Sequence, residues 1–198
     1  MLRSRAPDAQ SLRVATHPAV WSAVKHALLD RELRYLALTD ELTCLYNRRG
    51  FFAAAAHQLK LARRNMQGML LFFGDLDNLK KINDTYGHAE GDLALVRAAD
   101  ALEEAFRESD VVARLGGDEF AVLALTGPND SEQGLLRRLE KSMEKASRND
   151  CRYQLSISIG VARFDPKRAV TLGELMAEAD KAMYERKRGR LPPILSKM

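Results

Sequence analysis

The chain has 198 residues, 46% of them hydrophobic, and a formal net charge of +4 at neutral pH. This length suits one domain with an appendage, and the apolar fraction supports a sizeable core. Two cysteines without metal-ligand spacing exclude a disulfide framework, and no apolar run is long enough to span a bilayer.

The mild positive charge is spread along the sequence. Because the basic residues are scattered and have no interleaved aromatics, we favour a solvated surface over a nucleic-acid interface. The same excess of positive charge would also suit the binding of a substrate that carries several phosphates. Cys44 and Cys151 indicate a reducing compartment. Since there is also no signal-peptide pattern, we expect a cytoplasmic location and no membrane segment in this chain.

A helix is predicted from Pro18, after a polar and irregular stretch over residues 1–17. One stripe of this helix, here called the seam, has residues spaced alternately three and four apart: Trp21, Val24, Leu28, Arg31, Tyr35 and Leu38. Five of these six side chains are apolar, which suits a short coiled coil. The seam covers fewer than three heptads, so an amphipathic helix packed on its own domain is an equal alternative.

The rest of the chain predicts a βαββαβ unit between two helices. We expect strands over 69–73, two within 111–124, and 155–161. We expect helices over 51–64, 92–108, 131–147 and 172–187, and a short helix or turn over 79–86. This order is typical of the α+β class, as a ferredoxin-like split βαβ sheet with helices on one face.

The predicted hairpin carries chemistry in its turn, where Gly116 and Gly117 precede Asp118 and Glu119. Adjacent glycines permit a positive φ and a close approach of the backbone to a ligand. Most turns of this composition have no functional role. A functional role is indicated here by a second acidic group, Asp75-Leu76-Asp77, which follows the strand predicted over 69–73.

The directions of the predicted strands bring the two acidic groups close together. A right-handed crossover makes the first two strands parallel, so the end of the first strand and the hairpin turn share one edge of the sheet. Asp75 then lies near Asp118 and Glu119, and the last helix returns to this edge with Lys187 and Arg190. Close carboxylates need a cation between them, and magnesium also pairs with phosphates. We therefore favour a metal-dependent phosphoryl-transfer site over a set of solvated acids.

Three motifs, over 40–51, 75–92 and 114–120, resemble in order those of GGDEF-domain diguanylate cyclases. The resemblance implies a palm-like, nucleotidyl cyclase sheet preceded by a signalling helix. It implies GTP as substrate, cyclic di-GMP as product, and Mg²⁺ or Mn²⁺ as cofactor. It divides the chain into a tail and coiled-coil-like helix (1–38), a GGDEF domain (39–191) and a C-terminal tail (192–198).

The resemblance also assigns roles at the acidic edge. Asp75, the Leu76 carbonyl and Asp118 would bind the metal, and Asp118 would also assist deprotonation of the 3′-hydroxyl. Glu119 would bind the metal or support a group that does. The phosphates would be met by five residues: Lys80, Gly116, Gly117, Lys187 and Arg190.

Asn83 and Asp92 would read the guanine base, according to the resemblance. A carboxylate can accept hydrogen bonds from guanine N1–H and its exocyclic amine, and adenine offers no matching pair. The alternative for Asn83 and Asp92 is helix capping. His88 is expected to stabilise a turn.

The sequence departs from the family pattern at three places. Cys44 stands at a usual glycine, and Leu79 stands at a usual phenylalanine near the base. The C-terminal motif is one residue short, which leaves open whether Arg186 or Lys187 meets the phosphates.

The resemblance implies a homodimer, because each site holds one GTP and the product joins two. The predicted seam would bring the two protomers together. The alternative is a catalytically silent domain that binds GTP or cyclic di-GMP and signals by contact. Intact acids and glycines at the predicted site argue against a silent domain.

Arg107 and Asp110 stand three apart before the second strand. They suit a helix end followed by a loop aspartate. Their offset from the hairpin also resembles the family's product-inhibition site. There arginine would clamp a phosphate or lie on guanine, and Asp110 would accept from a guanine edge.

Overall fold

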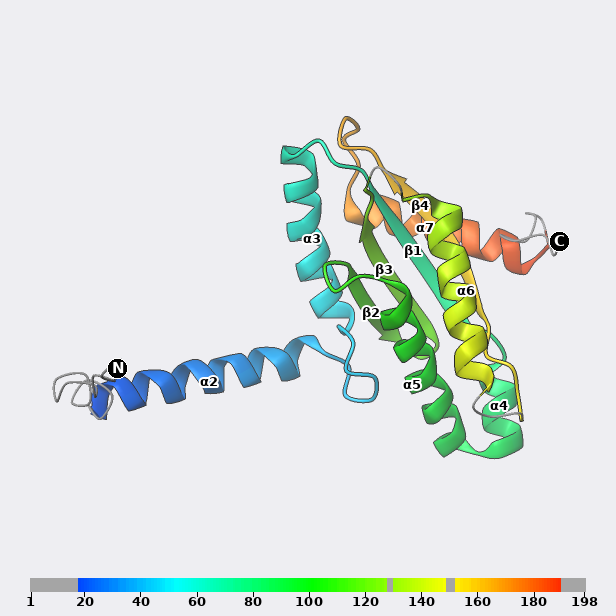
Figure 1. The fold of residues 1–198 in the computed structure, drawn as a ribbon, viewed down its shortest axis with the longest axis horizontal. Helices are drawn as coiled ribbons and strands as arrows, with labels where there is room; N and C mark the ends of the chain where they lie inside the picture. The colour runs from blue at the N-terminus through cyan, green and yellow to red at the C-terminus, as the bar shows by residue number, and fades with distance from the viewer. Residues whose placement is uncertain (1–17, 128–129, 149–151, 190–198) are drawn as a thin grey trace, which may run out of the picture. The chain divides into compact units, whose positions relative to one another are not determined.

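The structure, a computed structural model, describes residues 18–127, 130–148 and 152–189 (Figure 1). The chain divides after Ala37 into two units, which are described separately below. Helix α2, Pro18–Leu38, belongs to the first unit except for its last residue, Leu38.

Helix α2 carries large apolar side chains that are exposed: Val20, Trp21, Val24, Leu28, Leu29, Leu33 and Leu36. Three of them, Trp21, Val24 and Leu28, belong to the predicted seam. The helix matches its predicted span, and pairing through the seam stays a prediction. No helix in the described part of the chain combines the length and apolar character that a membrane span requires.

The second unit is built on a four-stranded sheet in the order β2-β3-β1-β4 (Figure 1). The strands are β1 Met69–Leu76, β2 Val111–Gly116, β3 Glu119–Leu125 and β4 Ile157–Phe164. The helices are α3 Arg48–Arg64, α4 Leu79–Tyr86, α5 His88–Ala105, α6 Glu132–Arg148 and α7 Leu172–Lys187. All neighbouring strands are antiparallel. The predicted α+β class and split βαβ order are therefore confirmed.

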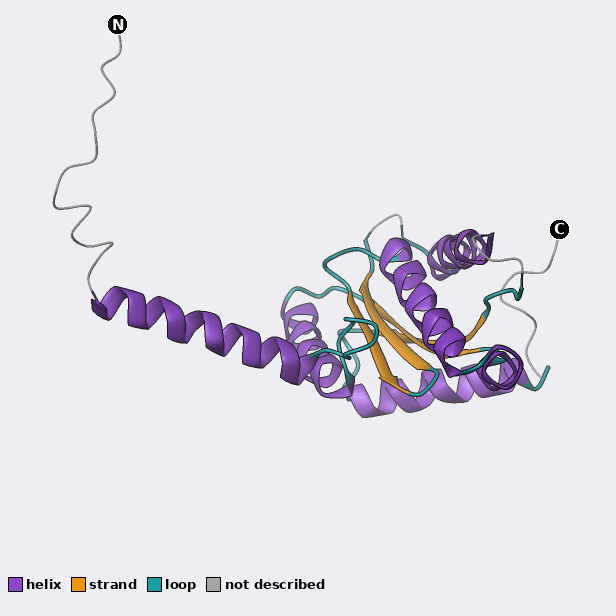
Figure 2. Cartoon of the chain, turned by 90° about the horizontal axis from the view of Figure 1, so that it is seen from below, coloured by secondary structure: helices purple, strands orange, loops and turns teal. Residues whose placement is uncertain are grey.

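Helices cover both faces of the sheet (Figures 1 and 2). Along β1, Leu70 and Phe72 pack in the core of α5 and α6, whereas Met69, Leu71 and Phe73 pack in the core of α3 and α7. The prediction of helices on one face is right for the crossover helices α5 and α6. It is incomplete for the unit as a whole, because a continuous apolar strand such as β1 needs cover on both sides.

Several element boundaries differ from the predictions. Strand β1 runs on to Leu76, so Asp75 and Leu76 are its last residues instead of following it, and helix α3 begins at Arg48 rather than at residue 51. Helix α5 begins at His88 rather than at residue 92, with Gly87 as its N-cap residue. Strand β4 begins at Ile157 and reaches Phe164, because it pairs with the whole of β1.

Gly160 allows β4 to pack closely on α7. A Cβ atom at Gly160 would lie 1.9 Å from the Ala179 carbonyl oxygen and 2.3 Å from the Met183 nitrogen, both backbone atoms. Helix α7 would have to move away from the sheet to make room.

We predict that Gly160→Ala lowers the free energy of unfolding by about 1–3 kcal/mol, the usual range for overpacking. Urea denaturation measures this change. The control is Gly173→Ala in the first turn of α7, where the nearest atom to an added Cβ is 4.0 Å away. This control should be neutral or should stabilise by up to about 1 kcal/mol. Equal effects of the two substitutions would contradict the packing argument.

Candidate active site

The β2–β3 turn presents open backbone. Gly116 has φ of 150° and Gly117 has φ of 52°, as expected for adjacent glycines in this turn. A Cβ atom at either position would meet no atom within 4 Å. The glycines are therefore required by their backbone conformation and leave space beside the turn for a ligand.

Arg114 holds this turn in place. Its Nε and Nη2 donate to the Gly117 carbonyl at 3.0 and 2.8 Å, and its Nη1 donates to Asp40 Oδ1 at 3.1 Å. Asp40 Oδ1 also accepts hydrogen bonds from the N–H and the hydroxyl of Thr43. The motif over 40–51 therefore supports the hairpin turn from outside the sheet.

The contacts around Asp40 lower the pKa of its carboxyl. Burial raises the pKa of the Asp40 carboxyl, but the hydrogen bonds from Thr43 and Arg114 and the Arg114 charge outweigh burial. The net result is a pKa below its ordinary value, so the fold favours the ionised carboxylate.

The end of β1 lies beside the hairpin turn. Asp75 is the register partner of Glu119, and the Leu76 N–H donates to the Asp118 carbonyl at 2.9 Å. The side chains of Asp75, Asp118 and Glu119 are partly exposed. The sheet therefore brings the predicted acids to one edge, as chain direction required.

Lys187, the last residue of α7, reaches the same edge. Its Nζ donates to Asp75 Oδ1 at 2.5 Å, across 112 residues of sequence. The ammonium partly balances the negative charge that the neighbouring acids create. Arg186 instead donates to the Ile159 carbonyl of β4 at 2.7 Å, so Lys187 is the one of the two that faces the acids. Arg190 lies outside the described residues.

Asp77, which follows β1, is held by β4. Its two carboxylate oxygens accept hydrogen bonds from the hydroxyls of Ser156, at 2.8 Å, and Ser158, at 2.6 Å. These bonds attach the end of β1 to β4.

The predicted metal ligands are two carboxylates, of Asp75 and Asp118, and the Leu76 carbonyl. Within residues 18–127, 130–148 and 152–189, no three His, Cys, Asp or Glu side chains form a group that could hold a metal. The predicted set does not depend on such a group, since one ligand is a backbone oxygen. Oxygen donors suit magnesium, and the ammonium on Asp75 shows that a cation fits beside this carboxylate.

Asn83 and Asp92 lie at the corner between α4 and α5. A Cβ atom at Gly91 would lie 1.8 Å from Asn83 Oδ1, so the Asn83 amide rests directly on the α5 backbone. Gly87 is the cap residue between the two helices, and neither Asn83 nor Asp92 caps a helix end. The capping alternative is therefore wrong, and Asp92 is an exposed acid in the second turn of α5. Lys80 is exposed in the first turn of α4.

Glu90 ties this corner to the segment before β4. Its carboxylate accepts hydrogen bonds from the Tyr153 hydroxyl at 2.7 Å and from Arg152 Nη2 at 2.8 Å. The Tyr86 hydroxyl donates to the Arg152 carbonyl at 3.0 Å. Sequence reasoning missed this cluster because each of its hydrogen bonds joins residues more than 60 positions apart.

Arg107 and Asp110 lie at the opposite end of β2 from the glycine turn. Asp110 is buried, and its oxygens accept the N–H groups of Arg107, at 2.9 Å, and Leu125, at 3.1 Å. Arg107 makes a two-pronged ion pair with Asp130 at 2.8 and 3.0 Å. A hydrogen bond from the Gly127 N–H and the Arg107 guanidinium lower the pKa of Asp130. Asp110 thus has the structural role of a loop aspartate, while Arg107 has an exposed side chain.

Known proteins are similar to this chain over most of its length. The family profile described as "Diguanylate cyclase, GGDEF domain" matches residues 37–190. Diguanylate cyclase TpbB of Pseudomonas aeruginosa is 40% identical over 161 residues, which cover 79% of this chain and 36% of TpbB. Probable diguanylate cyclase DgcC of Escherichia coli is 34% identical over 168 residues, which cover 84% of this chain and 45% of DgcC. The chain thus spans less than half the length of either relative.

The fold is also similar to a solved structure, the coiled coil and GGDEF domain of DgcB from Caulobacter crescentus in complex with c-di-GMP. The TM-score is 0.74 at 26% identity, and the match covers 92% of this chain and 96% of the DgcB chain.

The lowered pKa of Asp40 predicts a pH dependence of stability. Its contribution to the free energy of unfolding is present above the ordinary pKa of 3.8 and is lost as pH falls through the lower folded value. Asp40→Asn should therefore be less stable than the parent at neutral pH, with a difference that shrinks below pH 3.8. Denaturation at a series of pH values measures the difference.

The control is Asp100→Asn, which changes an exposed aspartate of α5 and should leave stability unchanged across the series. A stability loss in Asp40→Asn that does not vary with pH would contradict the role of the ionised carboxylate.

Proposed function

The chain belongs to the GGDEF family of diguanylate cyclase domains, and from this membership we propose that it condenses two GTP molecules into one cyclic di-GMP and two pyrophosphates. One observation carries the proposal. Asp75, Asp118 and Lys187 converge at the sheet edge beside a turn whose backbone is open to a ligand. Such an edge can bind the phosphates of a nucleotide and the cation that accompanies them.

Each GTP would lie between the hairpin turn and the α4–α5 corner. The Gly116 and Gly117 backbone would contact the phosphates, with Lys80 and Lys187 supplying positive charge. The base would meet Asn83 and Asp92, and the Asn83 amide is already fixed against Gly91. This placement uses one face of α4 and α5 for the base and the sheet edge for the reaction.

Asp75, the Leu76 carbonyl and Asp118 would hold Mg²⁺, with Mn²⁺ as an alternative. The bound metal would stabilise charge on the phosphates and lower the pKa of the attacking hydroxyl. In the reaction, the 3′-oxygen of one GTP bonds to the α-phosphorus of the other, and the bond from that phosphorus to pyrophosphate breaks. Asp118 accepts the hydroxyl proton, with Glu119 beside it, and Lys187 neutralises charge on the leaving group.

Two protomers are required, because each supplies one GTP and the two attacks are related by a twofold axis. The exposed apolar side chains of α2 would join them as a homodimer. The similarity to the coiled coil and GGDEF domain of DgcB supports this role for α2.

Product inhibition would act through Arg107. A phosphate of cyclic di-GMP would accept hydrogen bonds from the Arg107 guanidinium. To make this contact, Arg107 would give up its ion pair with Asp130. Asp110 would position Arg107 by holding its N–H. Inhibition then requires coupling between two distinct sites.

We predict that Asp118→Ala and Asp75→Ala each reduce kcat by at least about 10²–10³, the usual loss for one preorganised electrostatic group. The assay incubates full-length protein with GTP and Mg²⁺ and identifies the product by mass spectrometry. Asp180→Ala, an exposed aspartate of α7, is the control and should keep parental activity. Parental activity in either site variant would show that the metal assignment is wrong. GTP binding by the parent without turnover would indicate the silent alternative.

Regulation through Arg107 gives a paired prediction. Arg107→Ala should need a higher cyclic di-GMP concentration for half inhibition than the parent. Asp130→Asn should need a lower one, because it releases Arg107 from its ion pair. Adding product to the GTP assay measures all three proteins. Equal inhibition of the three would indicate competition at the active site and would exclude the second site.

A further inference from the structure

A cluster of polar and aromatic side chains joins the α4–α5 corner to the segment before β4. Its centre is Glu90 in the first turn of α5, whose side chain is only 11% exposed. One carboxylate oxygen accepts from the Tyr153 hydroxyl at 2.7 Å and the other from Arg152 Nη2 at 2.8 Å, and Arg97 lies 3.9 Å away. Solvent screens most surface ion pairs. Because the Glu90 carboxylate is shielded and bonded at both oxygens, it holds its partners in place.

Tyr86 adds contacts from the other helix of the corner. It is the last residue of α4, and its hydroxyl donates to the Arg152 carbonyl at 3.0 Å. The centroids of the Tyr86 and Tyr153 rings lie 5.8 Å apart, and the Arg152 guanidinium carbon lies 5.6 Å from the Tyr86 ring centroid. Both helices of the corner therefore contact the same two residues, Arg152 and Tyr153.

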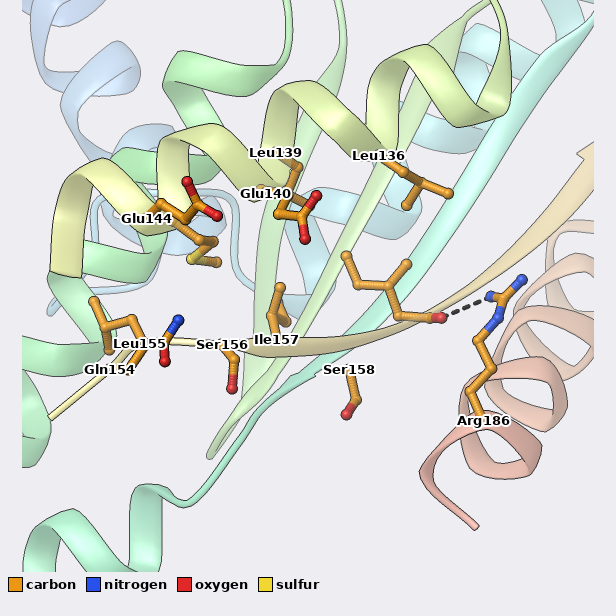
Figure 3. Close-up of a pocket in the computed structure, with 12 residues that line it drawn as sticks. Leu136, Leu139, Glu140, Glu144, Gln154, Leu155, Ser156, Ile157, Ser158 and Arg186 are labelled. Carbon is orange, nitrogen blue, oxygen red and sulfur yellow. Dashed lines mark hydrogen bonds between the residues drawn. The ribbon is translucent and has the colours of Figure 1, made fainter. Parts of the chain in front are cut away.

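The segment that receives these contacts, residues 152–156, is itself fixed to the sheet. Leu155 is buried in the core, and its N–H donates to Ser147 Oγ of α6 at 2.9 Å. The Ser156 carbonyl accepts from the Asp77 N–H at 2.9 Å, directly after the end of β1. Figure 3 shows Leu155 and Ser156 leading into β4 alongside α6. A continuous path of contacts therefore runs from the end of β1, where the predicted metal ligands lie, to the α4–α5 corner.

The corner also carries the two residues that the proposed function assigns to the guanine base. Asn83 stands three residues before Tyr86 on α4, and Asp92 stands two residues after Glu90 on α5. The Asn83 amide rests on Gly91, the residue next to Glu90. Hydrogen bonds weaken steeply when donor and acceptor are misaligned. Movement of either helix would therefore weaken the contacts of the corner with the base.

We propose that Glu90 is a positioning residue for guanine recognition and acts through Arg152 and Tyr153. It fastens the α4–α5 corner to the segment bonded to the end of β1, and it thereby sets where Asn83 and Asp92 lie relative to the sheet edge. This role rests on the proposed function, which places the base at the corner, and it adds a residue that does not touch the nucleotide. Loss of the fastening weakens the selection of guanine more than the binding of phosphates, because the phosphates are contacted at the sheet edge.

Nucleotide binding by the full chain tests this role. Titration calorimetry with Mg²⁺ compares non-hydrolysable analogues of GTP and of inosine triphosphate, whose base lacks only the 2-amino group of guanine. The parent should prefer the GTP analogue, because Asp92 can accept from the amine. Glu90→Ala should reduce the ratio of the two dissociation constants at least about threefold, since misaligned hydrogen bonds contribute less. Tyr153→Phe loses one hydroxyl and keeps the ring, so it should reduce the ratio by less, and it also tests the role if Glu90→Ala does not fold.

The control is Glu104→Ala, which removes another ion-paired carboxylate of α5, bonded to Lys145 at 2.7 Å. It should keep the parental ratio. A purely structural role of Glu90 would lower the amount of folded protein and leave the preference between the two nucleotides unchanged. An unchanged ratio in folded Glu90→Ala, or in Tyr153→Phe if only that variant folds, would therefore overturn the proposal.

The parent protein separates this proposal from the proposed function. Equal binding of both analogues by the parent would show that Asn83 and Asp92 do not read guanine, and it would overturn that assignment and the role of Glu90 together. Selective binding of the GTP analogue by a parent that does not turn over GTP would contradict the cyclase activity alone. The ratio measured for the variants would still decide the role of Glu90, because binding is measured without turnover.

Discussion

The antiparallel pairing of β1 with β3 is the constraint on which the site depends. The pairing runs from Met69 with Leu125 to Asp75 with Glu119, and it ends where the glycine turn begins. A slip of one residue would move every β1 side chain to the opposite face. The cores on both faces therefore fix the register, and the register fixes which carboxylates meet at the sheet edge.

Electrostatic support for this edge comes from distant parts of the chain. Arg114 holds the Gly117 carbonyl and is itself held by Asp40, and Lys187 contacts Asp75. The turn can therefore stay open, because its conformation is maintained by a side chain from the strand before it. A nucleotide that binds here therefore does not lose free energy in ordering this backbone.

Much of this arrangement was predictable from local patterns and chain direction. The approach of the glycine turn to the end of β1 and the return of Lys187 follow from strand order alone. The Arg114–Asp40 and Glu90–Tyr153 contacts were not predicted, because they join residues 74 and 63 positions apart and depend on side-chain reach. The helix predicted over 92–108 begins four residues earlier, at His88, and Gly91 within it leaves room for the Asn83 side chain.

The central claim is that Asp75 and Asp118 bind the metal that accompanies GTP. Carboxyl carbon NMR signals of the full chain, recorded with Mn²⁺ and a non-hydrolysable GTP analogue, test it most directly. The account predicts paramagnetic broadening of the Asp75 and Asp118 signals, with the Asp180 signal unchanged. Sharp Asp75 and Asp118 signals at saturating metal and nucleotide would contradict it.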